Sequence, residues 1–321
     1  MKKMLNTVTI AGRVYEHKLA VKVAGDNSKN PGVEFINGTL SIATDDECLN
    51  VVQVHYTYVT AVTKSGSANA TYNTLKAIID GKIGSVMNDG IENAGFVKCD
   101  TNIDLNEFYS DRNGKEELVS AKRNEGGFVH QIQANELPES EAARASFKAD
   151  MVITRATRLE ADEERDLPER MTIKGAIFNF RNALLPVEFT VLHPKAMDYF
   201  ENLEISSQNP VFTQVAGKQI SQTVVQTIEE ESAFGEPAIR ERRSTKKDFV
   251  VTWAKAEPYL WDDESTLLAS ELSEAMANRE VELAAMKTRQ AEYQNSKGAF
   301  NTAPAKAAPA KAPKVSSNYD F

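Results

Sequence analysis

The sequence is poor in the residues that catalytic and metal sites require. Its four histidines are scattered along 321 residues, and none has a Cys or a second His at metal-ligand spacing. No Gly-x-Ser-x-Gly motif occurs, and although the glycines of residues 90–95 have phosphate-loop spacing, Phe96 stands where the lysine belongs. We therefore predict a protein without enzymatic activity, metal or cofactor.

Cysteines and long apolar runs are also scarce. Cys48 and Cys99 are too few for a secreted disulfide scaffold, and both lie in predicted strands, where we expect them to be core residues. No stretch approaches the roughly 20 apolar residues of a membrane helix. Met1–Thr7 precedes no apolar run of signal-peptide length. These absences predict a protein of the reducing cytoplasm of a bacterial host cell, with no membrane partner.

Acidic residues outnumber basic ones, but the basic residues are clustered. The net charge is −9, whereas residues 2–22 carry five cations against one acid, and so do residues 240–247. Binding of a polyanion depends on where the charges lie and not on their sum, so the net charge does not exclude a nucleic-acid partner. The alternative is that both clusters are merely solvated faces.

The first half of the chain is predicted to be mostly β-structure. Val8, Ile10 and Val14 alternate with more polar residues at the period of a half-buried strand, and two further apolar runs to residue 62 form a hairpin. A short helix follows over residues 72–80, and the last two strands flank an Asn-Gly turn at residues 113–114. The order of three strands, one helix and two strands predicts a first domain over residues 1–133.

The same order recurs in the second half. After a connector over residues 134–147 come strands, a helix beginning at Pro194, more strands, a long polar loop with residues 240–247 and a closing strand. We predict a second domain over residues 148–262, a helix over 263–294, and a disordered Ala-, Pro- and Lys-rich tail over 295–321. The fold class is therefore predicted as mainly β: two tandem copies of one small barrel, a C-terminal helix and a tail.

Aromatic and cationic side chains lie on or near the predicted hairpins. Single-stranded nucleic acid binds surfaces that combine cations for phosphates with rings on which bases stack. We favour the surface for Tyr56 and Tyr109, and the core for Phe178, Phe189 and Phe249. The predicted nucleic-acid-binding residues are Arg13, Lys18, Lys22, Tyr56, Tyr58, Phe108, Tyr109, Arg112, Lys115, Lys122, Arg123, Arg181, Arg240, Arg242, Arg243, Lys246, Lys247 and Trp253.

Three segments of the first half follow a known pattern. Asn6–Val14 is an apolar strand that opens with Asn and contains Gly-Arg near its end, and Gly38–Thr44 follows as a second strand. Leu105–Ser110 and Glu117–Lys122 flank a charged loop. Together they resemble strands 1, 2, 4 and 5 of the OB-fold single-stranded DNA-binding proteins of phages and bacteria. The resemblance covers residues 6–133, and residues 148–256 in topology alone.

The resemblance implies a five-stranded barrel whose hairpin loops and concave strand face hold single-stranded DNA. It also implies that Tyr319, Asp320 and Phe321 form a shortened version of the acidic tip through which members of the family dock replication and recombination proteins. The resulting hypothesis is a non-sequence-specific single-stranded DNA-binding protein of phage DNA replication, recombination and repair, with a second copy of the chain as a candidate partner in a homo-oligomer. The alternative is a β-rich virion or assembly protein whose barrels bind other proteins.

Overall fold

The computed structural model describes residues 4–112, 115–162, 167–230, 238–261 and 267–300. Side chains are described for these residues except at 111–112, 115, 223–230, 238–245 and 293–300. Among the described residues, no helix is both long enough and apolar enough to cross a membrane.

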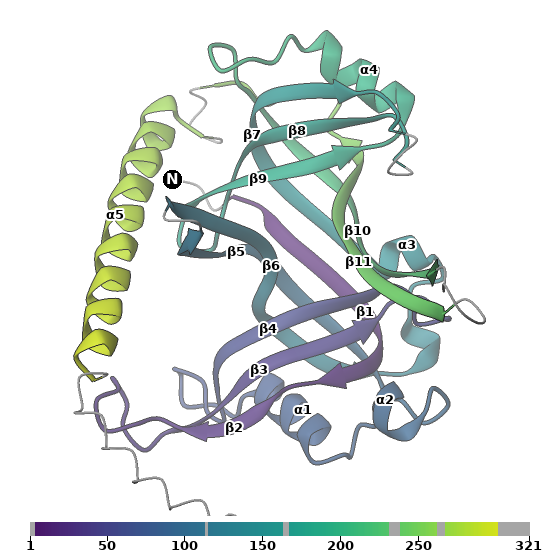
Figure 1. The fold of residues 1–321 in the computed structure, drawn as a ribbon, viewed down its shortest axis with the longest axis vertical. Coiled ribbons are helices and arrows are strands. Elements are labelled where there is room, and N and C mark those ends of the chain that lie inside the picture. Colours follow the sequence, from purple (N-terminus) through teal and green to yellow (C-terminus); the bar gives the residue numbers. More distant parts are fainter. Residues whose placement is uncertain (1–3, 113–114, 163–166, 231–237, 262–266, 301–321) are drawn as a thin grey trace, which may run out of the picture.

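Five strands close into a first barrel (Figure 1). They are β1 (Asn6–His17), β3 (Glu34–Ala43), β4 (Val51–Thr60), β5 (Phe96–Arg112) and β6 (Lys115–Ile132). Around the ring the order is β1-β3-β4-β6-β5, and β4 and β6 are the one parallel pair in it. The short strand β2 (Ala20–Val23) extends β3, and the helices α1 (Ala70–Ile79) and α2 (Val86–Asp89) lie between β4 and β5.

A second barrel repeats this plan. Its strands are β7 (Ala145–Leu159), β8 (Arg170–Phe178), β9 (Leu184–Val191), β10 (Val211–Glu230) and β11 (Ala238–Ala254), and α4 (Pro194–Asn202) lies between β9 and β10. The ring order is β7-β8-β9-β11-β10, again with one parallel pair, β9 with β11. The prediction of a mainly β fold with two tandem OB-like barrels is therefore confirmed.

Local sequence explains why these segments adopt these elements. In β1 the apolar residues Val8, Ile10 and Val14 point into the core, as their alternation predicted. Gly12 is required there, because a Cβ at this position would lie 1.9 Å from the carbonyl oxygen of Ala43 on β3. Helix α1 begins at Asn69, whose side chain accepts a hydrogen bond from the backbone N–H of Thr71.

The two barrels are joined through their first strands. β1 pairs with β7 from Asn6–Ala149 to Ile10–Ala145, so one sheet runs through both barrels. The buried amide of Asn6 donates to the carbonyl oxygens of Ile103 in the first barrel, at 2.9 Å, and Phe178 in the second, at 3.1 Å. One apolar core cluster also continues through both barrels. The domain division at residues 133 and 148 consequently stays a prediction; η1 (Ala134–Glu136) and α3 (Glu141–Arg144) lie between them.

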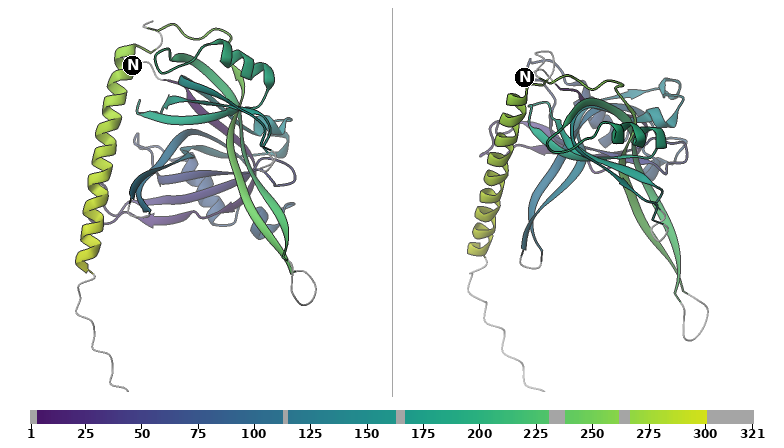
Figure 2. Two further views of the ribbon diagram at one scale, coloured as in Figure 1. Left: turned by 45° about the horizontal axis from the view of Figure 1, so that its top comes forward. Right: turned by 90° about the horizontal axis from the view of Figure 1, so that it is seen from above.

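Two long hairpins project as arms from the same side of the body (Figure 2). The first arm is formed by β5 and β6, the second by β10 and β11, and each reaches the other barrel. Helix α5 (Ala269–Phe300) stands beside the first arm, where Arg279 forms a 2.7 Å ion pair with Glu107 and Gln290 hydrogen-bonds the backbone of Tyr109.

Two local expectations were wrong. Residues 240–247 are part of β11 and not of a loop, because β10 pairs with them along the whole second arm. Cys48 lies in a turn with φ of 59° and not in a strand, since Asp45 ties this turn together by accepting hydrogen bonds from the backbone N–H groups of Leu49 and Asn50. Of the predicted disordered tail over 295–321, residues 295–300 are instead the end of α5, and residues 301–321 lie outside the described residues.

Candidate nucleic-acid interface

The outward side of β3 and β4 in the first barrel carries polar and aromatic side chains, and we call it the β3–β4 face. On β4, Val52, Val54 and Tyr56 point into the core, whereas Gln53, His55 and Thr57 point outward. On β3, the side chain of Thr39 contacts His55, with 3.2 Å between Oγ1 and Nδ1. The face is thus a direct product of strand alternation.

Two rings pack against each other at one end of the β3–β4 face, with their planes tilted by 35°. The ring centroids of Phe35 and Tyr58 lie 4.5 Å apart, and Tyr58 is 44% exposed. An irregularity in the pairing after Ile36 shifts the register, which turns Tyr58 outward although Tyr56 points inward. Lys22 of β2 pairs directly with Phe35, so a cation lies beside the ring pair.

Hydrogen bonds fix the polar groups next to these rings. The Lys22 ammonium donates to Oδ1 of Asn37 at 3.0 Å, and the Asn37 amide donates to the carbonyl oxygen of Thr57 at 2.9 Å. The Thr57 hydroxyl in turn donates to Glu125 on β6. The lysine is therefore held over the strands while staying exposed to solvent.

Arg123 and His55 form the middle of the face. Arg123 forms a 3.0 Å ion pair with Glu125 and donates to Asn106 of the first arm at 3.3 Å. Burial, followed by the positive charge of Arg123, lowers the pKa of His55 below its ordinary value of 6.5. His55 is therefore neutral at pH 7, and a polyanion on this face would favour its protonation.

The second arm brings further cations to the first barrel. Lys247 of β11 donates to Oε1 of Gln53 at 3.3 Å, and its neighbour Lys246 is exposed. The contact is reinforced by Asn50, whose side chain accepts a hydrogen bond from the backbone N–H of Ser221 on β10 at 2.6 Å. The β3–β4 face is therefore built by both barrels.

The first arm carries one exposed ring and one covered ring. Phe108 is exposed on the same side of the hairpin as Asn106, the acceptor of Arg123. Tyr109 points to the opposite side, half-buried under α5, with the Lys287 ammonium 5.8 Å from its ring centroid. Of the two rings predicted on this hairpin, Phe108 is thus the better placed for stacking.

The corresponding face of the second barrel is different. Its outward lysine, Lys174, forms a 2.7 Å ion pair with Glu188. The ammonium of Lys122 from the first arm donates to the carbonyl oxygen of Glu188 and lies 5.5 and 5.3 Å from the rings of Phe189 and Phe249. Burial lowers the pKa of Lys122. This lysine joins the barrels, which argues against its predicted contact with phosphate.

The prediction that Tyr56 stacks on bases is wrong. Tyr56 is 1% exposed, and its hydroxyl lies 3.2 Å from the sulfur of Cys99 inside the barrel. The two-residue spacing of Tyr56 and Tyr58 predicted a shared face, but the strand irregularity separates them. The predicted core residues Phe178, Phe189 and Phe249 are buried.

The remaining predicted residues are dispersed. Lys18 is exposed beside β3, but the Arg13 guanidinium lies 4.6 Å from the Phe96 ring centroid and donates to Ile91, away from the β3–β4 face. Arg181 and Trp253 are exposed on the second barrel. The side chains of Arg112, Lys115, Arg240, Arg242 and Arg243, and the whole of Tyr319, Asp320 and Phe321, lie outside the described part of the chain.

Sequence reasoning missed Phe35 and His55 as members of the face. Strand alternation could have indicated both residues, because each is adjacent in sequence to an apolar residue that points into the core, Ile36 and Val54 respectively. It missed Gln53 in its role as the partner of Lys247, and no sequence signal indicates a contact between residues 194 positions apart. No group of three or more His, Cys, Asp or Glu that could hold a metal ion occurs among the residues described.

Comparison with known proteins gives one family match and weak structural similarities. The model of the YorF family matches residues 4–289. The wild-type single-stranded DNA binding protein from Thermus aquaticus is 10% identical, with a TM-score of 0.43 over 79% of this chain and 93% of that chain. A deletion mutant of the same protein is 10% identical, with a TM-score of 0.44 over 83% of this chain and 100% of the other. No curated protein matches the sequence.

Proposed function

This chain belongs to the YorF family, and we propose that it is a non-enzymatic protein that binds single-stranded DNA without sequence specificity on the β3–β4 face. The observation that carries the proposal is the ring pair Phe35–Tyr58 beside Lys22, in which Tyr58 is exposed and Phe35 is half-buried. Stacking of bases on such rings is tolerant of sequence, because every base has a π-face.

The position of the face within its barrel supports the proposal. In OB folds the second and third strands of the ring, with the loops beside them, bind oligonucleotides or oligosaccharides. Here these strands are β3 and β4, and the last two strands of the barrel, β5 and β6, form the first arm. The cations Lys22, Arg123, Lys246 and Lys247 favour a polyanion over a neutral sugar chain.

Titration of fluorescein-labelled oligo(dT), followed by anisotropy, tests the proposal. We expect binding at low salt, and a logarithmic dependence on salt with a slope of about −0.7 for each phosphate contact, hence about −2 to −3 for these four cations. Duplex DNA of the same length should bind more weakly, because its bases are not free to stack. No anisotropy change at low salt would overturn the proposal and favour the assembly protein.

Roles beyond DNA binding are also part of the proposal. Protection of single strands in phage replication and recombination, in the cytoplasm of the host, would require partner proteins, and Tyr319–Phe321 is the candidate docking segment. Deletion of these three residues should abolish partner pull-down while leaving the affinity for oligo(dT) unchanged or tighter. A large loss of DNA affinity would contradict the assignment. Sedimentation equilibrium tests the homo-oligomer.

A further inference from the structure

The sheet that joins the two barrels also has an outward side, and this surface is separate from the β3–β4 face. We call it the seam face. Strand pairing defines two rows of side chains across it. One row runs Phe128, Asp100, Thr9, Ser146 and Lys218, on strands β6, β5, β1, β7 and β10. The other runs Thr7, Lys148, Ala216 and Trp253, on β1, β7, β10 and β11. Directly paired residues share one side of a sheet, so each row is a continuous surface.

Exposed rings stand at both ends of the seam face. Phe128 is 76% exposed on β6, and Phe180, 61% exposed, lines the same hollow. Gly127 turns the chain at this point with φ of 93°, beside a register shift after Asp100. At the other end Trp253 is 49% exposed. Phe128 and Phe180 are exposed side by side in one hollow, and neighbouring exposed apolar residues of this kind are typical of interaction sites.

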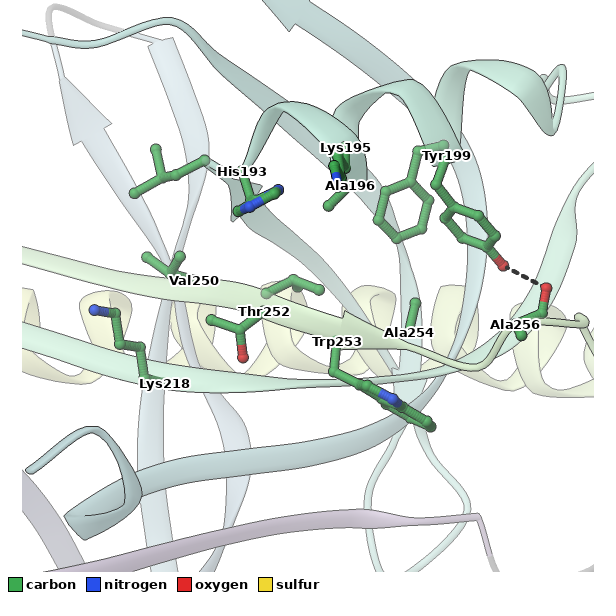
Figure 3. A pocket seen from close by; sticks show the side chains of 13 residues that line it. His193, Lys195, Ala196, Tyr199, Lys218, Val250, Thr252, Trp253, Ala254 and Ala256 are labelled. Carbon is green, nitrogen blue, oxygen red and sulfur yellow. Dashed lines mark hydrogen bonds between the residues drawn. The ribbon is translucent and has the colours of Figure 1, made fainter. Parts of the chain in front are cut away.

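Three adjoining hollows connect these rings. They measure about 630, 530 and 510 Å³, within the range of about 300–1,000 Å³ that is usual for ligand pockets. The first shares Thr7 and Thr9 with the second, and the second shares Lys218 and Thr252 with the third. Figure 3 shows the third hollow, with Trp253 and Thr252 on β11, Lys218 on the neighbouring strand, and His193 and Tyr199 at α4.

The charges along the seam face favour a polyanion. Among the described residues that line the three hollows, Lys148, Lys195 and Lys218 are cations and Asp100 is the one acid. The Asp100 carboxylate accepts a hydrogen bond from the Thr9 hydroxyl at 2.8 Å. Beside Phe180, the Arg181 guanidinium lies 5.0 Å from the ring centroid. A neighbouring hollow that shares Lys218 is lined by Asp45 and Glu141, which confines an anionic chain to the rows.

We propose that the seam face is a second track for single-stranded nucleic acid, with bases stacked on Phe128, Phe180 and Trp253 and phosphates held by Lys148 and Lys218. The identity of the ligand as single-stranded nucleic acid rests on the proposed function, whereas the location of the site is argued from the seam face alone. From β6 to β11 the rows cross five strand spacings, roughly 24 Å. At about 3.4 Å for each stacked nucleotide, this length accommodates no more than about seven nucleotides.

Trp253 supplies the reporter for the test. The chain has two tryptophans, and Trp261 is half-buried with its ring N–H donating to the carbonyl oxygen of Pro210. In the full chain carrying Trp261→Phe, emission therefore comes from Trp253 alone. Titration with oligo(dT) should quench this emission, and it should still do so when Phe35→Ala and Tyr58→Ala disable the β3–β4 face. Unquenched Trp253 at saturating oligo(dT) would overturn the inference.

Charge reversal gives a second, independent readout. Lys148→Glu with Lys218→Glu should weaken the Trp253-reported binding by at least about fivefold. The matched control, Lys64→Glu with Lys82→Glu, makes the same charge change at exposed positions outside the three hollows and should alter it less than twofold. Equal effects of the two pairs would overturn the inference, because they would show a general charge effect. Lys148→Gln with Lys218→Gln should also weaken binding, and thermal melting verifies that each variant is folded.

Failure of this inference and failure of the proposed function look different. If labelled oligo(dT) does not bind the wild-type chain by anisotropy, the proposed function fails. If it binds, and Phe35→Ala with Tyr58→Ala abolishes all binding with no Trp253 quenching in the parent chain, only the second track fails. Stoichiometry gives a further distinction: oligonucleotides shorter than about seven nucleotides should bind at two sites for each chain.

Discussion

The two barrels have the same ring order and the same position for their helix, yet their equivalent faces differ in chemistry. On the first barrel the outward side of β3 and β4 carries the half-buried Phe35 and the exposed Tyr58, with Lys22 of β2 beside them. On the second barrel the outward lysine is paired with Glu188, and the rings Phe189 and Phe249 lie in the core beneath Lys122. One backbone plan therefore supports either an open face of rings and cations or a face for intramolecular packing.

The arms show the same asymmetry. Lys122 on the first arm is held between the barrels, where burial lowers its pKa, whereas Lys247 on the second arm hydrogen-bonds Gln53 and stays exposed. Both lysines cross to the partner barrel at nearly corresponding positions. A lysine on an arm can therefore contact a polyanion only where the surface against which the arm packs keeps its ammonium exposed to solvent.

The largest effect is expected from the rings of the first barrel. Phe35→Ala with Tyr58→Ala should weaken oligo(dT) binding to the β3–β4 face by about 1–3 kcal/mol for each ring, that is, about 5- to 150-fold each. Lys174→Ala on the second barrel is the control and should leave the affinity within twofold. Anisotropy titrations measure both, and a comparable loss in the control would erase the distinction between the barrels.

A smaller effect is expected at the joint between the barrels. Asn6→Ala removes both amide hydrogen bonds and leaves the N–H of Ile103, a 3.0 Å partner of Oδ1, without its acceptor. We expect the free energy of unfolding to fall by about 1–3 kcal/mol for each buried group left unpaired. Denaturant unfolding measures the loss. An unchanged midpoint would mean that Asn6 does not hold the barrels together.

The two arm lysines should separate stability from affinity. Lys122→Ala should lower the free energy of unfolding by about 1–3 kcal/mol, with little change in oligo(dT) affinity, because it removes a hydrogen bond and two ring contacts between the barrels. Lys247→Ala should leave the free energy of unfolding nearly unchanged but weaken oligo(dT) binding, and it should reduce the magnitude of the salt slope by about 0.7. Lys122→Met, which keeps the apolar stem, should recover most of the stability. Loss of affinity in Lys122→Ala would assign that lysine to the ligand.

The smallest effect is the pH dependence of binding. The pKa of His55 is lowered below 6.5 in the free protein, and bound phosphate would raise it, so binding takes up a proton. Affinity should therefore increase a few-fold as the pH falls through this window, whereas stability should decrease, since the unfolded state binds the proton more readily. His55→Gln should remove both trends. Persistent pH dependence in this variant would point to another group.

The fold was largely predictable from the sequence, and the site only in part. The alternation of β1, the two strand segments on either side of the Asn-Gly sequence and Pro194 at the start of α4 are local signals, and the structure confirms the alternation, the pairing of the two strands and the proline. The strand irregularity that buries Tyr56 and exposes Tyr58 depends on pairing with β3, so one strand read alone could not reveal it. Residues 240–247 of β11 were misread as a loop because this charged segment lacks the alternation of a half-buried strand, whereas the end of β11 was predicted as a strand.

Contacts between the barrels could not be predicted at all. Lys122 was predicted to contact phosphate because it is a cation on a hairpin that also carries aromatic rings, whereas its actual partners lie more than 60 residues away in the sequence. The seam face likewise brings together Phe128, Thr9 and Trp253 only through pairing across six strands. Such surfaces follow from register, which a single sequence does not specify.

The pairing of β1 with β7 also affects how the chain is made. β1 emerges from the ribosome before β7, and residues 145–149, which cover the free half of its edge, follow more than 130 residues later. During that interval the nascent first barrel presents backbone N–H and C=O groups of residues 6–10 to the surroundings, an edge prone to pair with another chain. A truncated chain that stops before residue 145 should accordingly self-associate through β1, and proline at Thr7 should suppress that association.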